Sequence, residues 1–589
     1  MRLVITNGVL REGTMTSQIA ARLQLASAGA LGGALLWAVF EATDRDWIGD
    51  YPALVLTGLL LTFFGALLAM AGPIGLVRSL PRALLLAVVT AALLALTALR
   101  YDEAGDFFHN PIQALAGFIV AALPVPFLIA QARTGWRDYP ALFLEAWSIV
   151  LRLAAAGAFT GLVWLVIYLS DEVLRIVGID VIGKLLEHEV VVMALTGGVL
   201  GLGMAVVHDL AELLSPYVVL RLFRLFLPVV LGVMVIFLVA LPFRGLDGLI
   251  SGWSPALLLL TMVAGGVALV SIAIDQTDAD ATESPLLLRA TRAMAMILPI
   301  VAGLALYAIW LRVADHGWSP ERLFMACVAV VGIGYGLTYA VAVLRGAGWM
   351  ERIRQGNIRL ALAVTLLAAL WLSPLLNAER ISAQNQLARH EAGKTPVEAL
   401  DLYAIGQWGK PGAAVIAALE DRAKEPGQEA LAKLLSGEQV ASPEDTTVLA
   451  ARLAELIELQ PATATGTRDT LLAGAEAYQL QDWIQTCDQS LADGSRACLM
   501  VVAELLPLRP GEEAVFFLQR GPDYIEIAGL YLGDQGNLQY RTTLRADGLP
   551  VDTATAAELM RQYRLAPPPV TAAQLNQLGT GEAGLLILP

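Results

Sequence analysis

Charged residues, histidines and cysteines are all scarce in this chain. Only 16% of its 589 residues are charged, whereas soluble proteins carry about a quarter. The five histidines and three cysteines show no zinc-ligand spacing, and no Walker or G-x-S-x-G motif is present. A net charge of −14 without a basic, aromatic-interleaved patch argues against nucleic acid as a partner. We therefore expect no enzyme activity, no cofactor and no metal site.

Apolar residues are abundant instead, and they are concentrated before residue 377. They make up 57% of the chain, and a helix needs about 20 mainly apolar residues in succession to cross a bilayer. The sequence therefore predicts an all-α polytopic membrane bundle over residues 1–377, followed by a soluble α+β domain over 378–589. Eleven stretches meet the requirement: 23–40, 51–72, 81–99, 112–131, 148–170, 190–207, 225–242, 254–274, 293–313, 323–344 and 359–376. Pro124 and Pro126 predict a kink in the fourth of them.

Lysine and arginine are divided unevenly between the two sets of loops, and this predicts the orientation. With the N-terminus in the cytoplasm, 16 of them lie in cytoplasmic segments and 7 on the opposite side. The loop 345–359 alone holds four arginines. Because eleven is odd, we expect the C-terminal domain in the periplasm of a bacterium and the bundle in its inner membrane. The first apolar run has no clear cleavage site, so we expect it to be retained, with Met1 or Met15 as the start.

Two further segments, 171–189 and 209–226, mix apolar residues and charges at helical spacing. The pattern is typical of helices that lie in the plane of the lipid headgroups. It is equally compatible with loop helices that simply cover the ends of the bundle. We favour the second interpretation for both segments.

The domain after residue 377 is predicted to be helical over 378–485 and to form a small antiparallel sheet with one helix over 500–589. Helix-start signals stand at 395–398 and 442–445. Apolar and alternating runs at 514–519, 524–532 and 538–545 predict strands, and a helix is expected within 551–563. This domain has 16 basic and 28 acidic residues, so its net charge of −12 should repel anionic headgroups.

Two of the three cysteines, Cys487 and Cys498, flank a loop that Asp493 and Gly494 can reverse. Closing such a loop with a disulfide is worth about 3 kcal/mol in the chain-entropy model. We favour a disulfide over two free thiols, and a disulfide agrees with an oxidising compartment. Cys327 lies in an apolar stretch and is interpreted as core filling.

Three stretches of the membrane part resemble a bacterial protein family. They are the run from Leu225-Phe226-Leu227-Pro228 to Gly245-Leu246, the run from Leu298-Pro299 to Arg312, and Asp315-His316-Gly317-Trp318-Ser319-Pro320-Glu321-Arg322. They resemble the family called domain of unknown function 4153, in which the last stretch contains Gly-Leu-Thr-Pro-Glu-Arg. Trp318 and Ser319 depart from that motif. The resemblance, over residues 60–370, implies a polytopic membrane protein and no particular activity.

Two groups of polar residues lie at the ends of the predicted crossings. For Arg312, Glu321 and Arg322 we favour a helix start capped by Ser319, with an ion pair from Glu321 to one of the two arginines, over a polar gate. A proton relay is the functional interpretation of a second cluster, and an ordinary helix end in water is the simpler one. The members of that cluster are His208, Asp209 and Glu212.

One arginine is predicted to lie inside a crossing. Arg152 stands seven residues after Glu145, on about the same helix face, and an ionisable residue within the bilayer is a functional candidate by default. We favour snorkelling to the interface instead. Glycines also crowd two crossings, where tight helix packing is favoured over an unwound, substrate-binding helix. These are Gly197, Gly198, Gly201 and Gly203 in the sixth crossing, and Gly332, Gly334 and Gly336 in the tenth.

Two functions are compatible with these observations. The first is a binding or scaffolding protein of the cell envelope, whose outer domain meets a periplasmic protein. The second is a transporter or channel for a small solute, with Arg152 and Arg312 beside a water-filled cavity. The sequence specifies neither a substrate nor an oligomeric state.

Overall fold

A computed structural model describes most of the chain, which forms two compact units, Met1–Arg422 and Ala423–Pro589. The described residues are 2–102, 107, 111–209, 216–244, 255–436, 446–491, 494–506, 511–521, 524–533, 536–543, 551–571, 577–578 and 585–586.

Eleven helices in the described part of the first unit are long and apolar enough to cross a membrane. Each predicted stretch falls on one of them, so the predicted polytopic all-α bundle is confirmed, and the chain is a multi-pass membrane protein. The crossings belong to α1 (Arg2–Asp44), α2 (Asp50–Ile74), α3 (Leu76–Ala98), α5 (Pro111–Ala122) with α6 (Pro124–Arg133), α7 (Tyr139–Ile176), α9 (Glu189–Asp209), α11 (Phe226–Arg244), α12 (Pro255–Ile274), α13 (Pro285–His316), α14 (Pro320–Leu344) and α15 (Trp349–Leu372).

The fourth crossing is interrupted at its prolines. Pro124 and Pro126 have no backbone N–H, so helical hydrogen bonding lapses between α5 and α6. Leu123 between them keeps helical backbone angles, with φ −65° and ψ −31°. The two short helices therefore make one crossing together.

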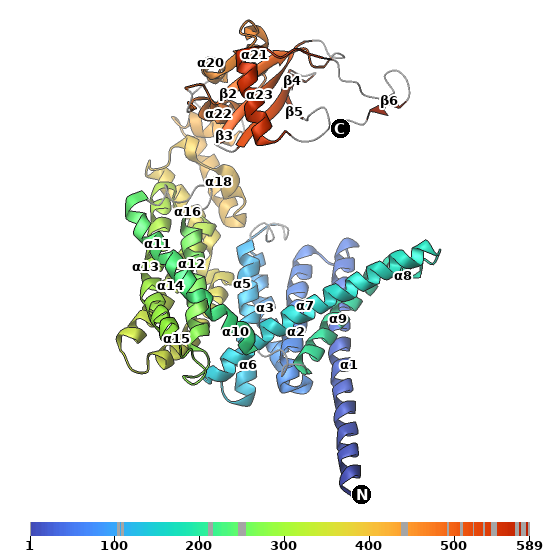
Figure 1. The fold of residues 1–589 in the computed structure, drawn as a ribbon. Coiled ribbons are helices and arrows are strands. Elements are labelled where there is room, and N and C mark those ends of the chain that lie inside the picture. Colours follow the sequence, from blue (N-terminus) through green and yellow to red (C-terminus); the bar gives the residue numbers. More distant parts are fainter. Residues whose placement is uncertain are drawn as a thin grey trace. The chain divides into compact units, whose positions relative to one another are not determined.

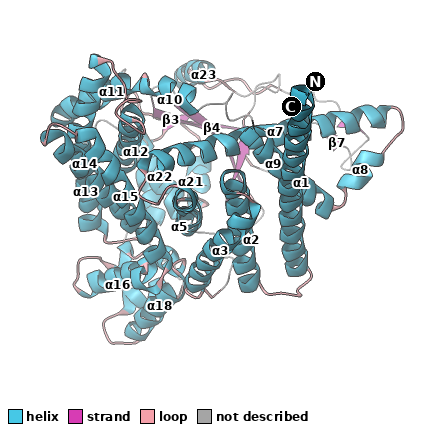
Figure 2. Cartoon of the chain, turned by 90° about the horizontal axis from the view of Figure 1, so that it is seen from below, coloured by secondary structure: helices cyan, strands magenta, loops and turns pink. Residues whose placement is uncertain are grey.

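The helices of the bundle form two groups on either side of α2, α3 and α5. Both views place α11 to α15 on one side and α1 and α9 on the other, while α7 runs obliquely across the middle of the bundle in Figure 1 (Figures 1 and 2). The largest core lies in the first group, where Leu259, Met294 and Leu298 are fully buried between α12, α13 and α14. α15 also contacts α3 and α5, which joins this group to the middle of the bundle.

The glycines of the sixth crossing allow α9 to pack directly against α1. A Cβ added at Gly29 would lie 2.0 Å from the Gly197 carbonyl oxygen, and one at Gly201 would lie 2.2 Å from the Leu25 carbonyl oxygen. In the tenth crossing, a Cβ at Gly336 would lie 2.6 Å from the backbone nitrogen of Pro299. Backbones approach this closely only where no side chain intervenes, so the predicted tight packing is confirmed at these positions.

The two loop helices behave differently from each other. α10 (Pro216–Arg224) packs against α7 and α12, where Leu220 is buried beside Phe143 and Ile272. It covers an end of the bundle, as expected for the described part of 209–226. α8 (Val181–Leu186) instead packs against α7 and α9 and leaves Val181 and Leu185 exposed. These contacts do not test the two interpretations of 171–189, and both stay predictions.

A short helical segment after the last crossing belongs to the first unit. It contains α16 (Ala378–Glu391), a 3-10 turn at Val397–Ala399, α17 (Leu402–Gly406) and α18 (Gly409–Ala423). We call residues 378–422 the juxtamembrane segment. The first unit thus reaches Arg422, beyond the boundary expected at residue 377. The start signal at 395–398 gives only the 3-10 turn, and the following helix, α17, is capped by Asp401.

The second unit is a five-stranded sheet with helices on both faces. Its strands run in the order β1-β2-β3-β4-β5, with β1 parallel to β2 and the other neighbours antiparallel. Their bounds are β1 Glu458–Gln460, β2 Cys498–Ala503, β3 Glu513–Gly521, β4 Tyr524–Leu532 and β5 Leu538–Thr542. The predicted strands become β3, β4 and β5, whereas β1 and β2 were not predicted. A separate two-stranded sheet pairs β6 (Gln577–Leu578) with β7 (Leu585–Leu586).

Alternating side chains of this sheet enter two cores. Phe516 packs against Trp483 on the face covered by α20 (Thr446–Leu456), α21 (Thr465–Ala473) and α22 (Ala477–Cys487). Phe517 packs on the other face with Met560 of α23 (Thr553–Leu565), the helix expected within 551–563. α19 (Glu429–Leu435) precedes these elements, and the start signal at 442–445 lies outside the described residues.

A disulfide joins Cys487 at the end of α22 to Cys498 at the start of β2. It is the pairing that the sequence favours over two free thiols. Both residues are fully buried in the core between α22 and the sheet. The bond therefore fixes one end of α22 to the second strand.

Candidate functional site

A charged cluster is buried where the chain leaves its last crossing. Arg100 follows α3, Gln113 lies on α5 and Glu379 lies in the first turn of α16. Glu379 is 1% exposed, and Arg100, Tyr101 and Gln113 are buried as well. The residues come from two distant parts of the sequence, 97–113 and 379. Thr97, Arg100, Tyr101, Gln113 and Glu379 together are called the junction lock.

The Glu379 carboxylate is the centre of the junction lock. Its Oε2 lies 3.0 Å from an Arg100 guanidinium nitrogen. Its Oε1 accepts hydrogen bonds from the Tyr101 hydroxyl at 3.0 Å and from Gln113 Nε2 at 2.6 Å. Three donors, two from the turn after α3 and one from α5, thus compensate one buried charge, as burial of a carboxylate requires.

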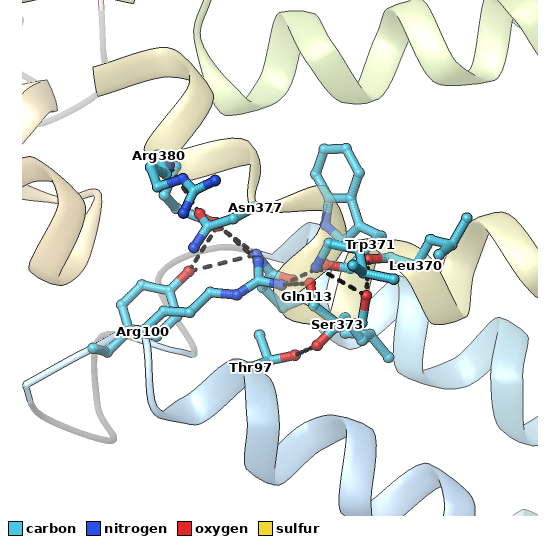
Figure 3. Close-up of polar contacts among 12 residues, drawn as sticks. Thr97, Arg100, Gln113, Leu370, Trp371, Ser373, Asn377 and Arg380 are labelled. Carbon is cyan, nitrogen blue, oxygen red and sulfur yellow. Dashed lines mark hydrogen bonds and ion pairs between the residues drawn. The ribbon is translucent and has the colours of Figure 1, made fainter. Parts of the chain in front are cut away.

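Arg100 also binds the C-terminal end of α15. Its guanidinium donates to the carbonyl oxygens of Trp371 at 2.8 Å and Ser373 at 2.6 Å, while Thr97 Oγ1 donates to the carbonyl of Leu372 at 2.7 Å (Figure 3). Carbonyls at a helix C-terminus have no partner within the helix and carry partial negative charge. A cation placed there stabilises the helix end and ties α3 to α15.

Tyr101 enters the junction lock as a proton donor. Burial raises the pKa of its phenol, and the neighbouring Glu379 carboxylate raises this pKa further. The hydroxyl therefore stays protonated at physiological pH and can donate to Glu379. Tyr51 binds the same turn from α2, donating to the Tyr101 carbonyl oxygen at 2.7 Å.

The juxtamembrane segment contacts the same end of the bundle at two more places. The Lys410 backbone N–H donates to the Arg100 carbonyl oxygen at 2.8 Å. Gly409 next to it has φ +60°, and a Cβ there would lie 2.5 Å from the same oxygen, so glycine is required. Arg389 of α16 donates to the carbonyl oxygens of Ala314 and Asp315 at the end of α13.

The predicted cluster of Arg312, Glu321 and Arg322 lies beside this second contact. Ser319 caps α14 as predicted, accepting from the Arg322 N–H at 3.3 Å. The Arg322 side chain donates to the Gly317 carbonyl oxygen at 2.8 Å. Within the part of the chain that the structure describes, Glu321 makes no ion pair with Arg312 or Arg322, so that predicted pair is wrong. The Arg322 side chain binds the backbone carbonyl at the end of α13 instead of the Glu321 carboxylate.

The opposite end of the bundle has a second buried ionic cluster. Arg224 pairs with Asp275, which is 0% exposed, and donates to the Ile272 carbonyl oxygen at 3.0 Å. Arg354 donates to the carbonyl oxygens of Ile274 at 2.8 Å and Asp275 at 3.0 Å. Burial raises the pKa of the Asp275 carboxyl, and the hydrogen bond from the Gln276 N–H opposes this shift. Both arginines therefore cap the C-terminal end of α12.

Arg152 lies in a third ionic group at the start of α7. Its guanidinium is 3.6 Å from the Glu145 carboxylate, which also pairs with Arg133 at 2.7 Å. The structure thus joins Arg152 to Glu145, as the seven-residue spacing indicates. The side chains of His208 and Asp209, and Glu212 as a whole, lie outside the described residues, so the relay stays a prediction.

Sequence reasoning missed the junction lock, although one signal was available. Gln113 is a polar residue near the start of an apolar stretch, and such a side chain needs a partner there. Arg100 and Glu379 each stand next to a predicted crossing, where water is the simpler partner. No pattern in the sequence connects residues that are 279 positions apart.

Comparisons with protein-family models, with curated proteins and with solved structures find no match. The resemblance to the family of unknown function therefore stays a prediction. Among the described residues, no group of three or more His, Cys, Asp or Glu side chains is arranged to hold a metal ion. What the junction lock can do is mechanical: it holds α16 against the ends of α3, α5 and α15.

The cap that Arg354 provides can be tested separately from the junction lock. We expect Arg354→Met to lower the free energy of unfolding by about 3 kcal/mol, because the buried Ile274 and Asp275 carbonyls lose a charged donor. The matched control is Arg359→Met, since Arg359 is exposed on the same helix. Denaturant titration in mixed micelles measures both variants. Equal stability of the two would show that the cap contributes nothing.

Proposed function

We propose that this protein belongs to a bacterial inner membrane and holds its C-terminal unit in the periplasm, where that unit binds or scaffolds another envelope protein. The observation that carries the proposal is the buried pair of Arg100 and Glu379. It attaches the first helix after the last crossing to the bundle. A tether that only had to anchor a domain would need no such attachment.

Three further observations support the assignment of side. The loops at the α16 end are poor in lysine and arginine, and the loops at the opposite end are rich in them. The Cys487–Cys498 disulfide is typical of an oxidising compartment. The resemblance to a bacterial membrane family agrees with a cytoplasmic membrane.

A scaffold accounts for the buried arginines better than a transporter or channel does. Arg100, Arg224 and Arg354 each contact a carboxylate together with the carbonyls that end a crossing helix. Solute pathways instead use charges near the bilayer midplane that are available to a substrate. These three arginines are engaged at the two ends of the bundle.

Reporter fusions test the orientation. A reporter active only in the periplasm is expected to work when fused after Pro589, and one active only in the cytoplasm is expected to work when inserted at Gly348. The exchanged pair is the control and should be inactive at both sites. A cytoplasmic signal from the C-terminal fusion would overturn the orientation.

Cross-linking in living cells tests the function. A photoreactive amino acid at Tyr478 or Tyr524, both exposed on the second unit, is expected to give a discrete protein adduct. Glu379→Ala should reduce its yield while the disulfide stays intact, and Glu391→Ala, in an exposed ion pair, is the matched control. Absence of any adduct, together with solute flux through the purified protein in liposomes, would favour the transporter instead.

A further inference from the structure

α7 is longer than a membrane crossing requires. It has 38 residues, which gives a length of about 57 Å, whereas the hydrocarbon core of a bilayer is about 30 Å thick. Its uncharged part runs from residue 153 to residue 170, between Arg152 and Asp171. About a turn and a half of helix follows Ser170 before α7 ends at Ile176.

An exposed apolar stripe passes from the crossing into this extension without a break. Its members repeat every three or four residues, so they share one face of the helix. They are Leu162, Leu165, Val166, Leu169, Val173 and Ile176, each more than half exposed. The first four lie in the uncharged part, where lipid is the surrounding medium. The last two continue the same surface beyond it, and Ile176 is 84% exposed.

The charges of the extension are kept off this stripe. Asp171 is buried. It lies nine helical positions after Leu162, so its side chain points to the opposite face of α7. Glu172 and Arg175 form an ion pair at 3.1 Å. Tyr168, three residues before Asp171, is also exposed. Tyrosines are enriched at membrane–water interfaces.

The apolar surface then continues through the turn into α8. Val177, Ile179, Val181 and Leu185 are all exposed, and Val181 is 66% exposed. In the described part of the chain, the extensive contacts of α8 are with its neighbours α7 and α9. Both views place α8 on the far side of α7 and α9 from α12 to α15 (Figures 1 and 2).

We propose that residues 173–186, called the α7–α8 paddle, dock on the lipid leaflet at the α16 end of the bundle. Their apolar side chains lie at the boundary of headgroups and acyl chains, with Lys184 and Arg175 among the headgroups. The lipid is favoured over a protein partner because the exposed stripe is continuous with the lipid-facing side of the crossing. The contact of a protein partner with the paddle would have to start at the point on α7 where the lipid contact ends.

Spin labels on the full-length protein in lipid nanodiscs test this proposal. Cysteines at Ile176, Val181 and Leu185 are introduced in a Cys327→Ala background that keeps the Cys487–Cys498 disulfide. Relaxation by oxygen, which partitions into lipid, is compared with relaxation by a water-soluble nickel chelate. The control label is at Lys433, an exposed helical position of the second unit.

We expect the ratio of relaxation by oxygen to relaxation by the nickel chelate to be several-fold higher at the three paddle sites than at Lys433. We also expect nitroxide lipids that are labelled high on the acyl chain to broaden the spectra of the three paddle labels. A ratio equal to that at Lys433 would mean that the paddle lies in water. Exclusion of both relaxants would mean that a protein or a second copy covers it. Either outcome overturns the proposal. If each labelled protein elutes from size exclusion at the same volume as the unlabelled protein, the substitution leaves the fold intact.

Discussion

Replacing Glu379 with alanine is expected to lower the free energy of unfolding of the bundle by about 3–5 kcal/mol. The substitution leaves Arg100 buried without its carboxylate and removes the acceptor of Tyr101 and Gln113. An unpaired buried charge costs far more than the pair itself contributes. The measurement is denaturant unfolding in mixed micelles, followed by circular dichroism.

Two comparisons separate the junction lock from general damage. Glu391→Ala removes the exposed pair with Arg422 and should cost about 0–1 kcal/mol, because solvent screens such pairs. The double variant Arg100→Leu/Glu379→Leu should recover part of the loss, since it removes both charges at once. Recovery should be incomplete because Arg100 also caps α15. A Glu379→Ala protein as stable as Glu391→Ala would contradict the role of the junction lock.

Loss of the junction lock is also expected to loosen the start of the juxtamembrane segment. Ser373, Pro374 and Asn377 connect α15 to α16, and the Ser373 carbonyl is held by Arg100. Limited proteolysis should then cut this connection faster in Glu379→Ala than in the unaltered protein. The rate of cutting reports the local opening of the junction, whereas the unfolding free energy reports the whole bundle.

The crossings could be predicted because one local property decides them. A run of about 20 apolar residues must be helical in hydrocarbon, whatever its neighbours are. Strands β3 and β4 were equally local, with apolar residues between clear turns. β1 was not, because Glu458–Gln460 is three residues long and becomes a strand only by pairing with β2. β2 is a continuous apolar run, and the period of such a short run does not distinguish a buried strand from a buried helix segment.

The ionic clusters could not be predicted, because they depend on which helix ends meet. Arg354 was counted among the loop arginines that set the orientation, and it does stand at an end of the bundle. Its side chain, however, is 2% exposed and bonded to the α12 carbonyls. The first compact unit extends past residue 377 for a related reason: the composition becomes polar there, while the contacts of α16 with α14 keep it in the first unit.

Replacing Gly197 with leucine is expected to abolish stable packing of α9 on α1. Even a Cβ at this position would lie 2.1 Å from the Gly29 carbonyl oxygen, which is backbone and cannot swing aside. The two helices must then separate along the whole contact that Gly29, Gly33 and Gly201 also form. Overpacking of a core by a few methylenes already costs about 1–3 kcal/mol, and here the obstacle is rigid, so we expect a larger loss.

The test of this packing has a matched control on the neighbouring helix. Gly161 lies on α7 and is exposed, and a Cβ there would meet nothing within 4 Å. Gly161→Leu should therefore leave the yield of monodisperse protein and its thermal unfolding unchanged, whereas Gly197→Leu should lose most of the monodisperse fraction on size exclusion. Gly197→Ala should fall between the two. If Gly197→Leu matched Gly161→Leu, α1 and α9 would have to lie further apart than backbone contact, and lipid or another helix would have to fill the space between them.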